Sequence, residues 1–327
     1  MTTTHAVRAQ GLVKTFGDVN AVDGIDLEVR PGEIFGVLGP NGAGKTTTLR
    51  MLATLLPIDG GEAEIFGVDV RREPHKIRQL VGVTGQYASV DENLTGAENL
   101  ILFSRLLGQS TRQARRTAAD LLGRFGLEEA ADRQIQNFSG GMRRRLDLAA
   151  SLIARPPLIF LDEPTTGLDP RTRGQMWDTI RELVAQGSTI LLTTQYLDEA
   201  DQLADRIAVI DRGRKVAEGT PDQLKAGVGS STLHLRMAER EQTGRAAEIV
   251  ERVLGEVPAL TPEAGGLTIA LSDANQTADV LIALRQGAVD ITTAAVRQPT
   301  LDEVFLTLTG HHAEDETHEK HDDQEVA

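Results

Sequence analysis

The amino-acid sequence predicts an α/β fold, and two observations support this prediction. Short apolar runs at Ile34–Leu38 and Leu158–Leu161 are typical of strands that are buried on both faces of a sheet. Runs with helical character follow both of them, at Thr48–Ala53 and between Pro170 and Ala185. Because strands that alternate with helices build layered α/β domains, we expect a sheet covered by helices.

A glycine-rich segment joins the first of these strands to its helix. It reads Gly39-Pro40-Asn41-Gly42-Ala43-Gly44-Lys45-Thr46-Thr47 and fits the pattern G-x-x-x-x-G-K-[ST]. Glycines let the backbone turn its N–H groups onto a phosphate chain, and the helix start adds positive potential there. Lys45 supplies a point charge for the outer phosphates, and the hydroxyl of Thr46 suits Mg²⁺. The alternative is a glycine turn that happens to precede a lysine, but the strand before it and the helix after it favour a nucleotide site.

The composition limits the class of protein. The chain has 327 residues, enough for one large or two modest cores, and 40% of them are hydrophobic. It has no cysteines, which excludes disulfides and thiol catalysis. No run approaches about 18 uninterrupted apolar residues, so we expect no membrane span, and the polar start lacks the apolar region of a secretory signal. The formal net charge of −14 argues against a non-specific nucleic-acid binder.

The first part of the chain is predicted to form antiparallel strands. Apolar and polar residues alternate in Val7–Phe16 and in Ala21–Val29, and Gly61–Val70 has the pattern of another hairpin. Phe16 ends the first of these strands. Its ring is either a stacking platform for adenine or a core residue, and the sequence leaves both interpretations open.

A helical insertion is predicted from Tyr87 to about Ala154, after a short strand at Val81–Thr84. The pattern is helical from Thr95 to Phe125. Further along, Ser139-Gly140-Gly141 places a serine and two glycines at a helix start, which forms a second anion-receptive N-terminus. The arginines that follow, Arg143–Arg145, are interpreted as a solvated helix face, with phosphate binding as the alternative.

Two adjacent carboxylates end the buried strand at Leu158–Leu161. Asp162 is placed to hold Mg²⁺ or its water shell, and Glu163 is placed to polarise an attacking water. The alternative is a helix cap followed by a turn, which fits less well because the upstream phosphate loop requires such a partner. Ser188–Thr193 predicts a further buried strand, which Gln195 follows closely.

These motifs stand in the order found in ATP-binding cassette ATPases, which the chain resembles over about residues 6 to 222. The resemblance implies a P-loop NTPase core with an antiparallel β subdomain and a helical insertion. Three stretches further resemble the ATP-binding subunits of daunorubicin/doxorubicin-type bacterial drug exporters: Val83–Asp91, Thr193–Asp201 and Leu301–Leu306.

The resemblance also implies roles for individual residues. Phe16 would stack on adenine, and Gly39–Thr47 would cradle the phosphates of ATP. Thr46 and Gln86 would ligate Mg²⁺, with Asp162 behind them, and Glu163 would be the general base on water.

Other parts of the family pattern imply a head-to-tail homodimer with two sandwiched ATP molecules. Ser139 and Gly141, with Gly140 between them, would contact the γ-phosphate of ATP held by the opposite subunit, and Asp169 would pass information between the two sites. Met142 replaces the usual glutamine, a mild change. Gln195 replaces the usual catalytic histidine and cannot carry a proton, so slower or differently tuned hydrolysis is a hypothesis.

Three domains are expected: a nucleotide-binding domain at residues 1–222 with its helical subdomain at about 87–154, a small α+β domain at 223–310, and an acidic disordered tail at 311–327. In the small domain, apolar residues with helical spacing predict a helix with one buried face: Leu301, Val304, Phe305 and Leu308. The domain either has a role in regulation and docking or contributes only packing. From Ala313 onward the tail has seven acidic residues and one lysine. A metal site on the nearby histidines is the alternative to a solvated tail.

The sequence therefore predicts the ATP-hydrolysing subunit of a bacterial exporter for a drug or antibiotic-like molecule. Its partner would be a separately encoded integral-membrane permease, through which the chain sits at the cytoplasmic face of the membrane. One alternative is a soluble ATP-gated switch acting on nucleic acid or ribosomes, which the single cassette and acidic balance disfavour. Another, a nucleotide-binding regulator without turnover, depends only on Gln195.

Overall fold

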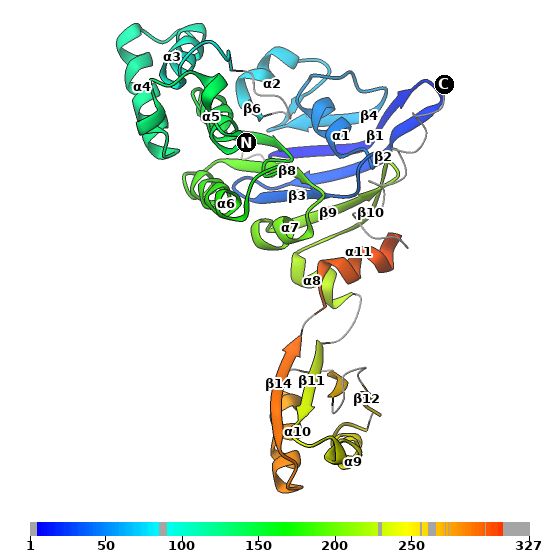
Figure 1. Ribbon diagram of the computed structural model, residues 1–327. Coiled ribbons are helices and arrows are strands. Elements are labelled where there is room, and N and C mark those ends of the chain that lie inside the picture. The colour runs from blue at the N-terminus through cyan, green and yellow to red at the C-terminus, as the bar shows by residue number, and fades with distance from the viewer. Residues whose placement is uncertain are drawn as a thin grey trace, which may run out of the picture. The chain divides into compact units, whose positions relative to one another are not determined.

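The computed structural model describes two compact units, one ending at Pro221 and one from Asp222 to Gly310 (Figure 1). Gln86 and the acidic tail lie outside the described residues. In the described part of the chain, no helix has the length and apolar character needed to cross a bilayer. The described residues are 5–84, 90–227, 231–255, 257–260, 266–271, 273, 275–297 and 299–309.

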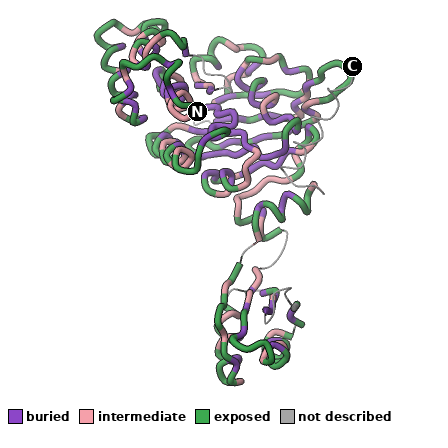
Figure 2. The backbone as a smooth tube through the Cα atoms, in the orientation of Figure 1, coloured by how far each residue is buried: buried purple, intermediate pink, exposed green. Residues whose placement is uncertain are grey.

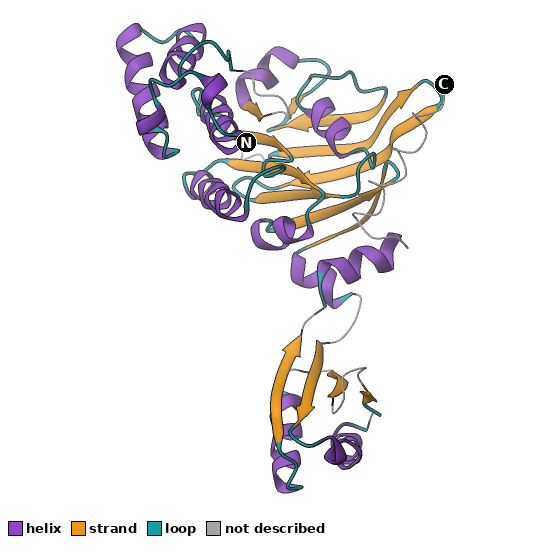
Figure 3. Ribbon diagram, in the orientation of Figure 1, coloured by secondary structure: helices purple, strands orange, loops and turns teal. Residues whose placement is uncertain are grey.

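The first unit is built around a six-stranded sheet with the order β10-β9-β3-β8-β7-β6. Its neighbouring strands pair in parallel, except that β10 is antiparallel to β9. Every residue of β3, β7 and β8 is buried, as the apolar runs predict, because helices and a second sheet cover the two faces (Figures 2 and 3). The strands are β3 (Ile34–Leu38), β6 (Val81–Thr84), β7 (Leu158–Asp162), β8 (Thr189–Thr194), β9 (Arg206–Asp211) and β10 (Arg214–Gly219).

Two hydrophobic cores lie on opposite faces of this sheet. Successive side chains of β7 point to opposite faces, so Leu158 and Phe160 enter one core while Ile159 and Leu161 enter the other. The first core is shared with the antiparallel sheet, and the second with the helices of the insertion and with α6. The central sheet is therefore fixed from both sides.

The antiparallel sheet has the order β2-β1-β4-β5 and confirms both predicted hairpins. Its strands are β1 (Val7–Phe16), β2 (Val19–Val29), β4 (Gly60–Ile65) and β5 (Val68–Asp69). Helix α1 (Lys45–Leu52) follows the glycine-rich loop, and α2 (Pro74–Leu80) leads into β6.

The helical pattern predicted from Thr95 to Phe125 forms two helices. Thr95 begins the first with a capping box shared with Glu98, and Ser110 caps the second. Gly108, with a φ of 85°, lies in the turn between them. Together with α5 these helices form the group at the upper left of Figure 1. The helices are α3 (Gly96–Leu106), α4 (Thr111–Arg124) and α5 (Gly140–Ser151), with short 3₁₀ turns at Glu128–Ala130 and Ile135–Asn137; α6 (Pro170–Ala185) and α7 (Leu197–Leu203) follow.

The second unit is an antiparallel sheet of order β12-β13-β11-β14 with a separate apolar core. Side chains from β11, β13, α9 and α10 make up this core. In α11, Leu301, Val304 and Phe305 are buried as predicted, but Leu308, in the last turn of the helix, is 40% exposed. The elements are α8 (Pro221–Ala226), β11 (Ser231–Met237), a 3₁₀ turn (Arg240–Gln242), α9 (Thr243–Leu254), β12 (Ala259–Leu260), β13 (Gly266–Leu271), α10 (Gln276–Gln286), β14 (Ile291–Arg297) and α11 (Leu301–Thr309).

Candidate functional site

The segments predicted to carry chemistry meet at the carboxyl edge of the parallel sheet. In the strand register, Leu38 lies beside Thr194, and Asp162 lies beside Thr193. The backbone N–H of Gly39 donates to the carbonyl of Thr194 over 3.3 Å. The loop after β3, the carboxylates at the end of β7 and Gln195 after β8 are therefore neighbours, as expected where parallel strands end together.

The loop after β3 requires glycine at two close approaches. A Cβ atom at Gly39 would lie 2.2 Å from the carbonyl oxygen of Ile210, and one at Gly44 would lie 2.3 Å from that of Ala21. Gly44 also has a φ of 102°, in the left-handed region that disfavours other residues. The backbone thus wraps tightly into the start of α1, as a phosphate-binding loop must.

Lys45 is buried at the centre of this loop, with 4% of its surface exposed. Its Nζ atom donates to the carbonyl oxygens of Gly39 and Pro40 over 2.8 and 2.9 Å, and lies 3.7 Å from Oε1 of Glu163. Burial lowers the pKa of Lys45, while the carboxylates of Glu163 and Asp162 act in the opposite direction. The ammonium group is thus held inside the loop beside the two carboxylates.

Asp162 lies between the start of α1 and strand β8. Its Oδ1 atom accepts hydrogen bonds from the hydroxyls of Thr46 over 2.8 Å and Thr193 over 2.6 Å. Hydroxyl and carboxylate oxygens are the hard ligands that Mg²⁺ prefers, so Thr46 and Asp162 fit a magnesium site. The predicted third ligand, Gln86, falls outside the described residues.

Glu163 stands in a strained backbone position, with a φ of 47°. Its N–H donates to the carbonyl and the hydroxyl of Thr193, both over 3.1 Å, and its Oε2 accepts from Thr166 over 3.2 Å. Arg144 clamps the same turn from α5, donating to the carbonyl oxygens of residues 162, 163 and 164 over 2.5, 2.8 and 3.2 Å.

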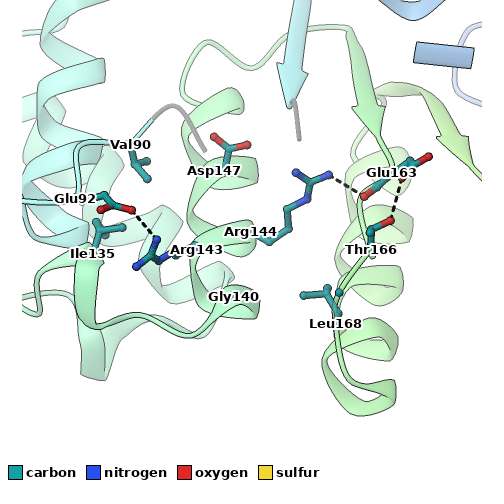
Figure 4. Close-up of a pocket in the computed structure, with 11 residues that line it drawn as sticks. Val90, Glu92, Ile135, Gly140, Arg143, Arg144, Asp147, Glu163, Thr166 and Leu168 are labelled. Atoms are coloured by element: carbon teal, nitrogen blue, oxygen red, sulfur yellow. Dashed lines mark hydrogen bonds and ion pairs between the residues drawn. The ribbon is translucent and has the colours of Figure 1, made fainter. Parts of the chain in front are cut away.

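The clamp by Arg144 corrects the interpretation of Arg143–Arg145 as a solvated helix face. A cavity of about 660 Å³ lies beside Glu163, and Figure 4 shows Arg144 pointing from α5 across to the Glu163 segment. Arg143 pairs with Glu92 over 2.6 Å at the other side of the cavity. The sequence could not show this role, because Arg144 binds backbone atoms that lie 18 to 20 residues further along the chain.

Ser139 and Asp169 begin neighbouring helices. The hydroxyl of Ser139 accepts from the N–H of Met142 and caps α5, while Asp169 accepts from the N–H and hydroxyl of Thr172 and caps α6. These two bonds to Thr172 lower the pKa of Asp169. Among the described residues, no hydrogen bond or ion pair joins residues 139–141 to residues 39–47 of the same chain.

The two glycines of α5 differ in their surroundings, which gives a direct test of this arrangement. A Cβ at Gly141 would lie 2.7 Å from Cγ2 of Thr172, whereas one at Gly140 would meet nothing within 4 Å. We expect Gly141→Ala to displace Thr172 and lower the melting temperature. Gly140→Ala, the matched control, should hold or raise it, because alanine favours a helix by up to about 1 kcal/mol over glycine. Equal melting temperatures in thermal denaturation would contradict the close approach.

Phe16 and Gln195 are the two remaining residues that the sequence assigns to the site. Phe16 is 49% exposed, so the interpretation as a core residue is wrong; Nζ of Lys14 lies 5.5 Å from the centroid of its ring. Its stacking on adenine stays a prediction. Gln195 is partly exposed directly after β8. Its role stays a prediction.

A glycine-rich loop with a buried lysine, beside a strand-end pair of carboxylates, defines a P-loop nucleoside triphosphatase. Residues 22–166 match the ABC transporter family, and residues 219–309 match the C-terminal domain of ATP-binding proteins like DrrA1-3. The chain is 52% identical over 325 residues to the daunorubicin/doxorubicin resistance ATP-binding protein DrrA of Streptomyces peucetius, covering 99% of this chain and 98% of the relative.

Two further relatives differ in how much of the chain they share. The doxorubicin resistance ATP-binding protein DrrA of Mycobacterium tuberculosis is 42% identical, with 96% of each chain covered. The Nod factor export ATP-binding protein I of Paraburkholderia xenovorans is 44% identical, but covers 70% of this chain and 76% of its own. Resemblance to the DrrA proteins thus extends through the second unit.

Solved structures agree with this assignment. A nucleotide-free cassette from an ABC transporter is 25% identical with a TM-score of 0.60, covering 66% of this chain and 91% of its own. A dimeric cassette in a post-hydrolysis state, bound to ADP and Pi, is 26% identical with a TM-score of 0.61, covering 65% and 98%. The chain belongs to the ABC transporter ATP-binding family, in the group of DrrA-type resistance proteins. It binds ATP, and its enzymatic activity is ATP hydrolysis.

Proposed function

We propose that this chain energises the export of a drug or antibiotic-like small molecule through a separate membrane permease. Two relatives of nearly full length are named for resistance to daunorubicin or doxorubicin, which supports this substrate class. The observation that supports the catalytic part is the short distance between Nζ of Lys45 and Oε1 of Glu163, which is 3.7 Å.

Glu163 is the general base of the proposed hydrolysis. Its carboxylate takes a proton from the attacking water, while Lys45 leaves the carbonyls of its own loop to pair with the outer phosphates. Thr46, Gln86 and Asp162 would hold Mg²⁺, which supplies positive charge against the phosphate oxygens. Phe16 presents an exposed ring for adenine, and Gln195 donates a hydrogen bond towards the γ-phosphate.

The complete site is proposed to require two copies of the chain. Ser139, Gly140 and Gly141 form a helix start suited to an anion, yet they make no bond to the loop at residues 39–47 in the described part of their own chain. In a head-to-tail dimer this helix start would contact the ATP of the other copy, and Asp169 would lie between the two sites. ATP would then close the dimer, and its hydrolysis would open it.

Location and partner follow from the same proposal. Transport needs a path through the bilayer, so the permease is a second protein, and the chain is peripheral at the cytoplasmic face of the membrane. The soluble switch acting on nucleic acid or ribosomes has less support, because the relatives are named for resistance and for export.

Affinity recovery of the full chain from detergent-solubilised membranes tests this partner. We expect an integral-membrane protein in stoichiometric amount, and we expect loss of drug resistance when that protein is removed from the cell. Recovery of ribosomes or nucleic acid in its place would overturn the export function.

Truncation separates the roles of the two units. A chain ending at Gly310 should match the full chain, because the deleted tail has no core-building residues. A chain ending at Pro221 keeps the loop, Glu163 and Gln195, so ATP binding should survive while membrane recovery and drug survival fail. If this shorter chain still localises and protects cells like the full chain, the second unit serves packing alone.

A further inference from the structure

Glu199 is a buried carboxylate that the proposed mechanism leaves without a role. It lies in α7, and its side chain has no exposed surface. Its Oε1 atom accepts hydrogen bonds from the hydroxyl of Thr165 over 2.8 Å and from Nε1 of Trp177 over 3.3 Å. A carboxylate is costly to bury, so one that stays inside a protein needs such donors.

Thr165 belongs to the turn that carries two proposed site residues. It lies between Glu163 and Asp169 and is itself fully buried. Within this turn, the N–H of Thr166 donates to the carbonyl of Glu163 over 3.3 Å, and its hydroxyl donates to Oε2 of Glu163. The N–H of Leu168 donates to the carbonyl of Thr165 over 3.1 Å. The hydrogen bond from Thr165 to Glu199 therefore fixes the turn between Glu163 and Asp169.

The other contacts of Glu199 lead to the remaining parts of the site. Trp177 belongs to α6, the helix that Asp169 caps. Helix α7 itself follows Gln195, where the N–H of Tyr196 donates to the hydroxyl of Thr194 over 2.9 Å and the N–H of Ala200 donates to the carbonyl of Tyr196. One carboxylate thus joins three segments, each of which begins at or follows a proposed site residue.

We propose that Glu199 is a positioning residue for ATP hydrolysis, which ties the turn of Glu163 and Asp169 to the segment that follows Gln195. The inference rests on the proposed role of Glu163 as the base. A base displaced by about 1 Å loses up to roughly a hundredfold in rate, so a buried tether beside it affects turnover more than ATP binding.

The hydrogen bonds that Glu199 accepts do not require its carboxyl group to be charged. Burial is the largest influence on this carboxyl and raises its pKa, against the hydrogen bonds and the positive charge of Arg173, which lower it. Arg144 is another cation that interacts electrostatically with Glu199. The donors Thr194, Thr165 and Trp177 need an acceptor oxygen, which a neutral amide also offers.

The experiment compares acceptor-keeping and acceptor-removing variants of the full chain. Glu199→Gln should keep kcat for ATP hydrolysis close to that of the wild type. Glu199→Met removes the acceptor and should lower kcat by about tenfold to a hundredfold, while the Kd for ATP stays unchanged. Thr165→Val, which removes one donor at constant shape, should lower kcat in the same direction. If Thr165 and Glu199 act through one bond, the double variant loses no more than the more impaired single variant.

The control separates positioning from stability. Ile65→Val shortens a fully buried side chain in β4, away from the tether, so it should lower the melting temperature without changing kcat. If Glu199→Met fails to fold, kcat of Thr165→Val and of Glu199→Gln still tests the positioning role of Glu199. Two results would overturn the positioning role of Glu199 if Glu163→Gln is inactive. One is an unchanged kcat in Thr165→Val, and the other is additive losses of kcat in the double variant. An active Glu163→Gln would instead overturn the proposed base.

Discussion

Replacement of Glu163 by glutamine is expected to nearly abolish ATP turnover while ATP binding persists. The amide has the same shape and can keep the hydrogen bond from Thr166, but it cannot take a proton from water. Proton transfer to a positioned base typically contributes about a hundredfold to ten-thousandfold in rate, and we expect a loss of this size. Because the proposed dimer would open on hydrolysis, we expect the variant to accumulate as an ATP-bound dimer.

Phosphate release and the molecular mass in the presence of Mg·ATP check this expectation. Glu33→Gln is the matched control, because Glu33 is also a buried carboxylate, paired with Arg206 at the start of β3, the opposite end of that strand from the phosphate loop. It should lower stability and leave turnover unchanged. Hydrolysis at the wild-type rate by Glu163→Gln would show that another group is the base.

Replacement of Lys45 by alanine is expected to collapse nucleotide affinity or turnover without unfolding the chain. In the proposed site the ammonium group pairs with the outer phosphates, and charge-assisted hydrogen bonds are roughly twice as strong as neutral ones. The variant should remain folded, because burial lowers the pKa of Lys45 and already disfavours its charged form in the absence of nucleotide.

Equilibrium binding of Mg·ATP and steady-state phosphate release provide the measurement. Lys215→Ala serves as the control: this lysine is partly buried and pairs with Glu218 on β10, outside the loop. The control should bind and hydrolyse ATP like the wild type. The phosphate-loop assignment fails if Lys45→Ala also leaves both properties unchanged.

The phosphate loop and the central strands could be predicted because their signals are local. The apolar runs of β3 and β7 are buried throughout, and the glycines at Gly39 and Gly44 occupy approaches that admit no side chain. The order of motifs along the chain was enough to indicate the family. The parallel register then brings the predicted residues to one edge.

Features that depend on distant contacts could not be predicted in this way. Arg144 acts on backbone carbonyls across the cavity, and a run of three arginines looks the same on a solvated helix. Glu199 lies in a polar-looking helix start, yet Thr165 and Trp177 enclose it. Leu308 follows the helical period of α11 but is 40% exposed in its last turn, because periodicity gives the direction of a buried face and not how far along the helix it extends.

The claim that one site is built from two chains has the most direct test in a mixture of two inactive variants. Glu163→Gln removes the base. Ser139→Asp keeps an oxygen that can cap α5 but sets a negative charge against the γ-phosphate. In a mixed head-to-tail dimer, one site would combine an intact Glu163 with an intact Ser139 from the other chain. Mixing equal amounts should therefore restore roughly a quarter of wild-type phosphate release, since half of the dimers are mixed and each has one intact site. No recovery above the separate variants would contradict the two-chain site.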